Sequence, residues 1–89
     1  MDYLPLHFNL KGRRCLLVGG GEIALRKADL LLQAGAHITV VALVVEAPLR
    51  ALLQDAHHEI YVRSYATADI QGKSLVISAT DNAQVNQQV

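Results

Sequence analysis

The sequence predicts an α/β fold in which a parallel β-sheet carries helices on both faces. Three observations lead to this prediction. First, short apolar runs of strand length recur along the chain. Second, segments with helical periodicity lie between the first three of these runs. Third, glycines follow the first predicted strand and the first predicted helix. Alternating strands and helices are typical of parallel sheets with right-handed crossovers. We therefore expect one α/β unit over residues 1–89.

The first strand is predicted at residues 14–18, where a continuous apolar run ends in three glycines. Runs of this kind are typical of strands buried on both faces of a parallel sheet. A helix is predicted next at residues 22–34, followed by Gly35 at the position where left-handed backbone is common. Four residues form the apolar face of this helix: Ala24, Ala28, Leu31 and Leu32.

The remaining segments continue the alternation. Residues 1–12 are expected to form an edge strand or an extended segment that ends in a turn. The later elements are predicted as a strand at 38–45, a helix at 46–56, a strand at 59–62, a helical turn at 67–70, a strand at 75–79 and the start of a helix at 82–89.

Composition argues against several classes of protein. Apolar residues make up 52% of the chain, which is too many for a disordered segment. The net charge of zero argues against broad binding to nucleic acid. No apolar run reaches membrane-spanning length, and the first residues lack the features of a secretory signal. The single cysteine, Cys15, excludes an internal disulfide, so a reducing compartment is expected.

A glycine-rich motif joins the first strand to the first helix. Residues 19–24 fit the pattern G-x-G-x-x-G/A. In this pattern Gly19 makes the tight turn, Gly21 lets a pyrophosphate approach the backbone, and Ala24 lets the helix pack closely on the strand. Free N–H groups at the helix start then face the phosphates. Strand, motif and helix together predict the first half of a Rossmann fold that binds a dinucleotide, with a purely structural turn as the alternative.

One feature of a typical NAD site is missing from the sequence. An Asp or Glu is usual at the end of the second strand, where it binds the ribose hydroxyls. Residues 40–45 are all apolar, and the first acid after them is Glu46. We therefore expect backbone groups, or Glu46 reaching back, to hold the ribose. The missing acid leaves open whether the cofactor is NAD or NADP. Arg26 and Lys27 are interpreted as solvated charges rather than contacts to a 2′-phosphate.

Small polar residues follow the last predicted strand. Ligands of parallel sheets bind at the carboxyl ends of the strands, and Thr80 and Asp81 lie at that edge. One of Thr80, Asp81 and Asn82 is expected to cap the next helix, and Thr80 and Asp81 are also candidate cofactor contacts.

Three other residues of interest are interpreted as structural. His57 and His58 beside Glu59 resemble a metal-binding cluster, but adjacent residues entering a strand point to opposite faces. A surface turn is therefore favoured there, and no metal site is predicted. Cys15 lies at the start of a buried strand and is expected to be an inert core residue.

Over essentially its whole length the sequence resembles the N-terminal part of siroheme synthase. The segments that carry the resemblance are Met1–Leu6, Cys15–Gly21, Arg26–Ala28, Leu30–Ala36, Ala79–Asp81 and Val85–Gln87. Together they are more specific than a dinucleotide fingerprint alone.

The resemblance implies a role in tetrapyrrole metabolism. The corresponding module of the family is an NAD-dependent precorrin-2 dehydrogenase that makes sirohydrochlorin, and it also inserts ferrous iron as a ferrochelatase to give siroheme. The implied partners are the tetrapyrrole, ferrous iron and a second copy in a cytoplasmic homodimer. The family's catalytic aspartate belongs to a strand beyond the last helix expected here. The chain is therefore expected to be truncated at its C-terminal end, and no catalytic residue is assigned.

The resemblance also implies positions for the cofactor contacts. By position, the family's NAD contacts fall at Glu22 and Ile23, and at Leu43 and Val44, where they would be made mostly by backbone groups. Thr80 and Asp81 would lie nearer the nicotinamide. The fold and fingerprint alone leave an alternative, a non-catalytic regulatory module that binds a dinucleotide.

Overall fold

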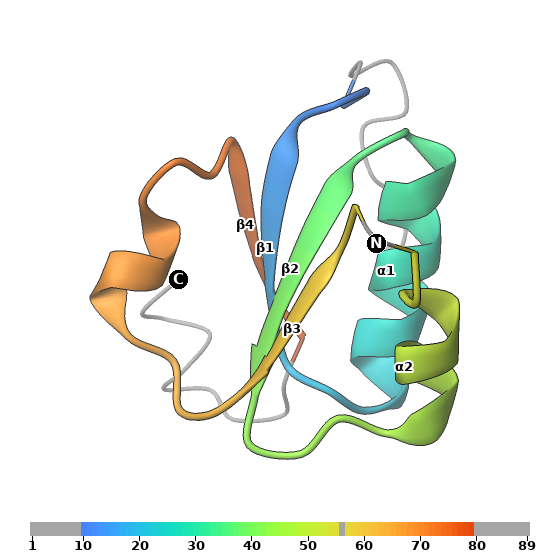
Figure 1. Ribbon diagram of the computed structural model, residues 1–89, viewed down its shortest axis with the longest axis vertical. Helices are drawn as coiled ribbons and strands as arrows, with labels where there is room; N and C mark the ends of the chain where they lie inside the picture. The colour runs from blue at the N-terminus through green and yellow to red at the C-terminus, as the bar shows by residue number, and fades with distance from the viewer. Residues whose placement is uncertain (1–9, 56, 80–89) are drawn as a thin grey trace.

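The described part of the chain forms a parallel sheet with helices packed against it (Figure 1). The computed structural model describes residues 10–55 and 57–79. Four strands lie in the order β3-β2-β1-β4, and all neighbouring pairs are parallel. The elements in chain order are β1 (Arg14–Val18), α1 (Glu22–Gln33), β2 (His37–Ala42), α2 (Ala47–Leu52), β3 (Glu59–Val62), the 3-10 helix η1 (Thr67–Ile70) and β4 (Leu75–Ser78).

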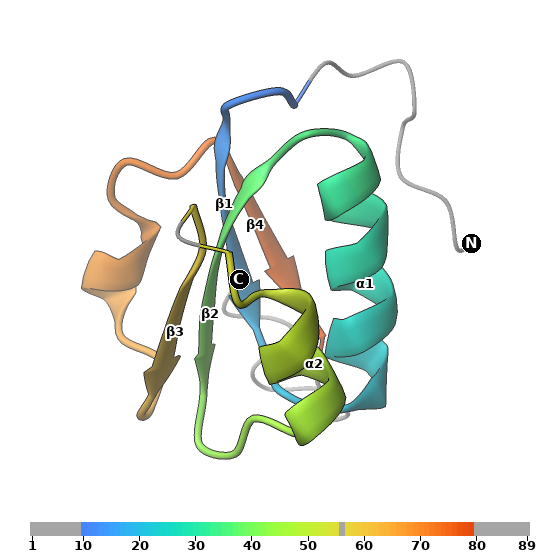
Figure 2. The ribbon, with the colours of Figure 1, turned by 45° about the vertical axis from the view of Figure 1, so that its right-hand side comes forward.

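The two faces of the sheet are covered differently. Helices α1 and α2 lie side by side on one face, and η1 lies on the other (Figure 2). The larger core cluster joins the first face to both α-helices and includes Leu17, Leu31 and Leu49, each fully buried. A smaller cluster of Leu16, Val18 and Val41 lies on the second face. The predicted α/β fold is confirmed, with η1 as the helical element of the second face.

The register brings the carboxyl ends of the strands to one edge of the sheet. Val18 in β1 is paired with Val41 in β2 and with Ser78 in β4. Ala42, which ends β2, is paired with Val62, which ends β3. The segments that leave this edge therefore lie close together, as ligand-binding loops do in open α/β sheets.

The second strand is shorter than the sequence predicts. It ends at Ala42, whereas the apolar run continues to Val45. Leu43 and Val44 are 69% and 72% exposed, and Val45 is buried again. The chain turns because the N–H of Glu46 donates to the C=O of Gly20 at 2.8 Å, so this contact ends the strand inside an apolar run.

The other boundaries lie close to the predicted ones. Helix α1 ends one residue early, and Gly35 after it has the expected positive φ, at 84°. Helix α2 is shorter than the predicted 46–56 segment at both ends. Most of the predicted N-terminal segment and all of the predicted 82–89 helix fall outside the described residues.

Within the described part of the chain, the helices are too short and too polar to cross a bilayer.

Candidate functional site

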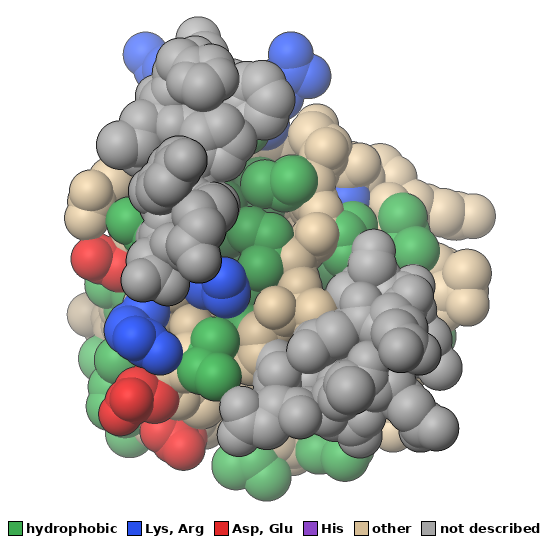
Figure 3. Space-filling model, turned by 180° about the vertical axis from the view of Figure 1, so that it is seen from behind, with side chains coloured by type: hydrophobic (Ala, Val, Ile, Leu, Met, Phe, Trp, Pro, Cys, Tyr) green, Lys and Arg blue, Asp and Glu red, His purple; other side chains and the backbone are tan. Residues whose placement is uncertain are grey.

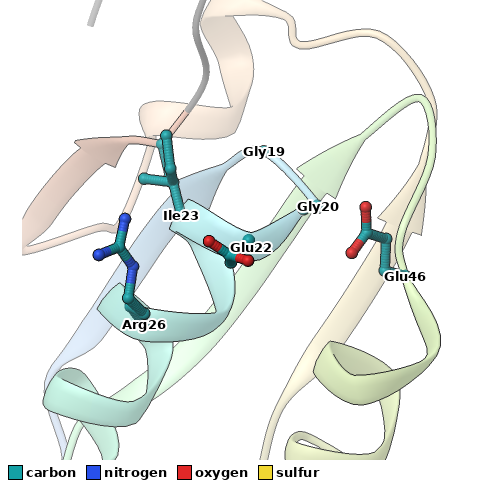
Figure 4. A pocket seen from close by; sticks show the side chains of 8 residues that line it. Gly19, Gly20, Glu22, Ile23, Arg26 and Glu46 are labelled. Atoms are coloured by element: carbon teal, nitrogen blue, oxygen red, sulfur yellow. The ribbon is translucent and has the colours of Figure 1, made fainter.

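A cavity of about 570 Å³ lies at the carboxyl edge of the sheet, where β1 passes into α1 (Figure 4). Its walls come from the glycine loop, the first turn of α1, the β2–α2 loop and the end of β4. The lining residues are Gly19, Gly20, Gly21, Glu22, Ile23, Arg26, Glu46 and Ala79. Its size is that of a cavity for a small molecule or cofactor.

The first two glycines of the loop are required by the fold itself. Gly19 has φ of 136°, a conformation that side chains disfavour, while its N–H still donates to the C=O of Val41 at 3.0 Å. A Cβ on Gly20 would lie 1.9 Å from the carbonyl oxygen of Val44, so no side chain fits there. The sequence analysis gave Gly20 no role, because its neighbour comes from a loop beyond the next strand.

Gly21 differs from the first two glycines. A Cβ placed there would lie 3.5 Å from Oε2 of Glu46, which is an ordinary contact, and its φ is −102°. Nothing among the described residues therefore requires glycine at this position. An added methyl group would instead occupy space in the cavity, which fits the predicted role of Gly21 in letting a ligand approach the backbone.

The start of α1 presents to the cavity N–H groups that have no hydrogen-bond partner among residues 10–55 and 57–79. Gly21 is the N-cap residue and supplies no side-chain cap. The N–H of Leu25 donates to the C=O of Gly21 at 3.0 Å, so the N–H groups of residues 22–24 precede the helical ladder. Ala24 is fully buried, which lets this end of the helix lie close to the sheet. Such a helix start, with its positive dipole end, suits a pyrophosphate.

Two of the predicted contacts lie beside the cavity rather than in its wall. Leu43 and Val44 are exposed in the β2–α2 loop and do not line it, although the carbonyl of Val44 is the atom that excludes a side chain at Gly20. Thr80 and Asp81 lie outside the described residues. Ala79, just before them, lines the cavity, and its N–H donates to the C=O of Val18 at 2.8 Å.

Among the described residues, the charged side chains that line the cavity are those of Glu22, Arg26 and Glu46. Figure 4 shows Arg26 and Glu46 on opposite sides of Glu22. Seen from behind, acidic and basic side chains gather on the side formed by α1 (Figure 3), where Glu22, Arg26 and Asp29 are exposed. Arg26 is thus a solvated charge, as predicted, that also reaches the cavity wall. Glu46, one of the two groups expected to hold the ribose, lines the cavity, and Arg26 and Ala79 line it without having been predicted as cofactor contacts.

The three histidines within the described residues, His37, His57 and His58, lie at the opposite end of the strands from the cavity and have structural contacts. Nδ1 of His58 accepts a hydrogen bond from the N–H of Ile38 at 3.0 Å, and burial lowers the pKa of His58. The ring of His57 stacks on His37 with centroids 5.1 Å apart. Cys15 is fully buried in β1, and burial raises the pKa of its thiol. These contacts agree with the structural interpretation of all three predicted residues.

Comparison with known proteins shows the family to which this chain belongs. Residues 6–89 match a family model described as "Putative NAD(P)-binding". The siroheme synthase of Pseudomonas entomophila (strain L48) is 54% identical over 89 residues, which are 100% of this chain and 19% of that protein. The siroheme synthase of Stutzerimonas stutzeri (strain A1501) is 56% identical over 86 residues, 97% of this chain and 18% of that protein.

A solved structure is similar as well. The structure of SirC, precorrin-2 dehydrogenase, superposes with a TM-score of 0.80 at 35% identity, and the match covers 90% of this chain and 40% of that one. This likeness confirms the Rossmann-like fold. The chain spans about a fifth of the length of the siroheme synthases it matches. The chain belongs to the NAD(P)-binding family whose model matches residues 6–89, and it corresponds to the N-terminal NAD(P)-binding region of siroheme synthase and SirC precorrin-2 dehydrogenase.

Proposed function

We propose that this chain is the NAD-binding part of a precorrin-2 dehydrogenase, which oxidises precorrin-2 to sirohydrochlorin in siroheme biosynthesis. The observation that carries the proposal is the cavity between the glycine loop and the uncapped start of α1. The relatives that cover the chain, siroheme synthase and precorrin-2 dehydrogenase, supply the reaction.

The residues around the cavity fit a dinucleotide. The N–H groups of residues 22–24 would hold the pyrophosphate, with Gly21 giving it room. In this fold the two halves of a dinucleotide lie on either side of the first strand. Glu46 follows β2 and would face the adenosine, whereas Ala79, with Thr80 and Asp81 after it, follows β4 and would face the nicotinamide. Bound NAD would supply the hydride acceptor for the oxidation.

The remaining parts of the proposal rest on what the resemblance to siroheme synthase implies. They are a tetrapyrrole substrate, insertion of ferrous iron into sirohydrochlorin, a homodimer and a cytoplasmic location. In residues 10–55 and 57–79, no three His, Cys, Asp or Glu side chains are grouped to hold a metal ion. We therefore assign no iron ligand among the described residues. No catalytic residue is assigned either, since the resemblance implies that the family's aspartate belongs to a later strand.

The experiment that tests the proposal has two steps. First, NAD is titrated calorimetrically into the 89-residue chain, with thermal melts alongside. Saturable binding is expected, and at a hundredfold excess over Kd it should stabilise the fold by about 2.7 kcal/mol. A folded chain that does not bind NAD would contradict the proposal.

The second step tests the reaction. The chain replaces the matching 89 residues of the Pseudomonas entomophila siroheme synthase, and NAD-dependent formation of sirohydrochlorin is followed by absorbance. The chimera should be active, and the same chimera with Gly21→Val should not, because the branched side chain fills the cavity beside Glu46. Binding of NAD by the chain with an inactive chimera would favour the regulatory dinucleotide-binding module instead.

A further inference from the structure

We infer that Glu46 selects NAD over NADP by accepting hydrogen bonds from the adenosine ribose and repelling a 2′-phosphate. The inference rests on the proposed NAD site and adds a specificity-determining residue to it. The acid expected at the end of the second strand is absent from residues 40–45, and Glu46 reaches the cavity from the loop beyond.

The backbone of Glu46 is fixed against the glycine loop. Its N–H donates to the C=O of Gly20 at 2.8 Å, and its own C=O accepts from the N–H of Leu49 and of Arg50 at 3.1 and 3.2 Å. Gly20 itself touches Val44, so the β2–α2 loop and the glycine loop are in direct contact. Glu46 is therefore held at the cavity wall by contacts on both sides.

The carboxylate of Glu46 is open to the cavity. Its Oε2 lies 3.5 Å from the position that a Cβ on Gly21 would take, which places it beside the backbone where the cofactor approaches. The side chain is exposed, and within the described part of the chain it has no hydrogen bond or ion pair. Its oxygens are thus available as acceptors for a neighbouring pair of hydroxyl groups.

Charge determines which nucleotide this position favours. A carboxylate accepts hydrogen bonds from ribose hydroxyls, whereas a 2′-phosphate would bring two negative charges against it. Among the described residues, Arg26 in the cavity lining and Arg50 on α2 make no ion pair with Glu46. Arg26 lies on the far side of Glu22 from Glu46 (Figure 4), and Nε of Arg50 donates to the C=O of Val45 outside the cavity lining.

The test compares NAD and NADP by calorimetric titration of the 89-residue chain and two variants. Glu46→Gln keeps the length and the acceptor oxygen of the side chain but removes its charge. Wild type should bind NAD more tightly than NADP, and in Glu46→Gln this preference should fall roughly tenfold. Glu59→Gln removes an exposed acid from the amino end of β3, away from the cavity, and should leave the preference unchanged.

A second measurement needs no variant. Because salt screens the repulsion, the preference of wild type for NAD should shrink as ionic strength rises. An unchanged preference in Glu46→Gln, with NAD still bound by both proteins, would overturn the role of Glu46 and leave the proposed function intact. A folded wild-type chain that binds neither nucleotide would overturn both.

Discussion

At the scale of single residues, each of the three glycines after β1 has a different structural reason. Gly19 has a positive φ, Gly20 has no room beside the carbonyl of Val44, and Gly21 has room but faces the cavity. The first two serve the fold, and the third is free to serve a ligand. Substitution by alanine can therefore separate folding from binding within one loop.

Gly20→Ala is expected to lower the stability of the fold, whereas Gly21→Ala is expected to lower the affinity for NAD. The Cβ at position 20 would meet backbone at 1.9 Å, so the β2–α2 loop must move, and the free energy of unfolding should fall by about 1–3 kcal/mol. The Cβ at position 21 meets only the side chain of Glu46 at 3.5 Å. Gly21→Ala should keep its stability in urea denaturation and lose NAD affinity in calorimetry. Equal loss of stability in both variants would contradict this division.

The sequence alone predicts part of this site. The motif spacing identifies Gly19, Gly21 and Ala24, because each role depends on the strand, turn and helix next to it in the chain. The need for glycine at position 20 depends on Val44, which is distant in sequence and is brought close only by the parallel pairing of β1 and β2. The same pairing brings Glu46 to the cavity, whereas the sequence offers Glu46 only as an alternative to backbone groups for holding the ribose.

At the scale of elements, patterns predict strands more reliably than they predict where strands stop. Residues 14–18 and 59–62 are observed with the predicted bounds, since polar or glycine residues flank both. The apolar run that begins in β2 continues past its true end, and a tertiary hydrogen bond from Glu46 to Gly20 decides the boundary. Periodicity carries no information about that bond.

The connection from β3 to η1 is fixed by one acidic side chain. Both carboxylate oxygens of Asp69 accept from Arg63, at 2.6 and 2.9 Å, and Oδ2 also accepts from the N–H of Ala66 at 2.8 Å. The N–H of Asp69 donates back to the C=O of Ala66 at 2.9 Å. The hydrogen bond from Arg63 is the main cause that lowers the pKa of Asp69 from 3.8 to about 2.

This ion pair makes stability depend on acid pH. The pKa of Asp69 is lower in the folded state than in the unfolded state. As pH falls, Asp69 is therefore protonated first in the unfolded state. The stabilisation by Asp69 is therefore present above about pH 5 and is lost between there and about pH 2. In urea denaturation across that range, Asp69→Asn should lose less stability than wild type as pH falls. Asp29→Asn, at an exposed position of α1, should show the wild-type dependence of the free energy of unfolding on pH. If Asp69→Asn also showed the wild-type dependence, the ion pair would make no contribution.

At the scale of the whole molecule, one core supports both the fold and the cavity. The larger cluster joins β1 and β2 to α1 and α2 on a single face of the sheet. Helix α2 is short, and Leu49 is its fully buried anchor in that cluster. Glu46 is the N-cap residue of the same helix, so the packing of α2 determines where the β2–α2 loop lies beside the glycine loop. Stability and binding are thus expected to be coupled through α2.

Leu49→Ala tests this coupling. Removal of a fully buried leucine side chain should lower the free energy of unfolding by about 2–5 kcal/mol. If α2 positions Glu46, the folded fraction of the variant should also bind NAD more weakly and show less preference for it over NADP. Ala51→Ser, at an exposed position of the same helix, should change neither urea denaturation nor calorimetric titration. Lower stability with wild-type affinity would instead mean that the hydrogen bond between Glu46 and Gly20 holds the loop without help from the core.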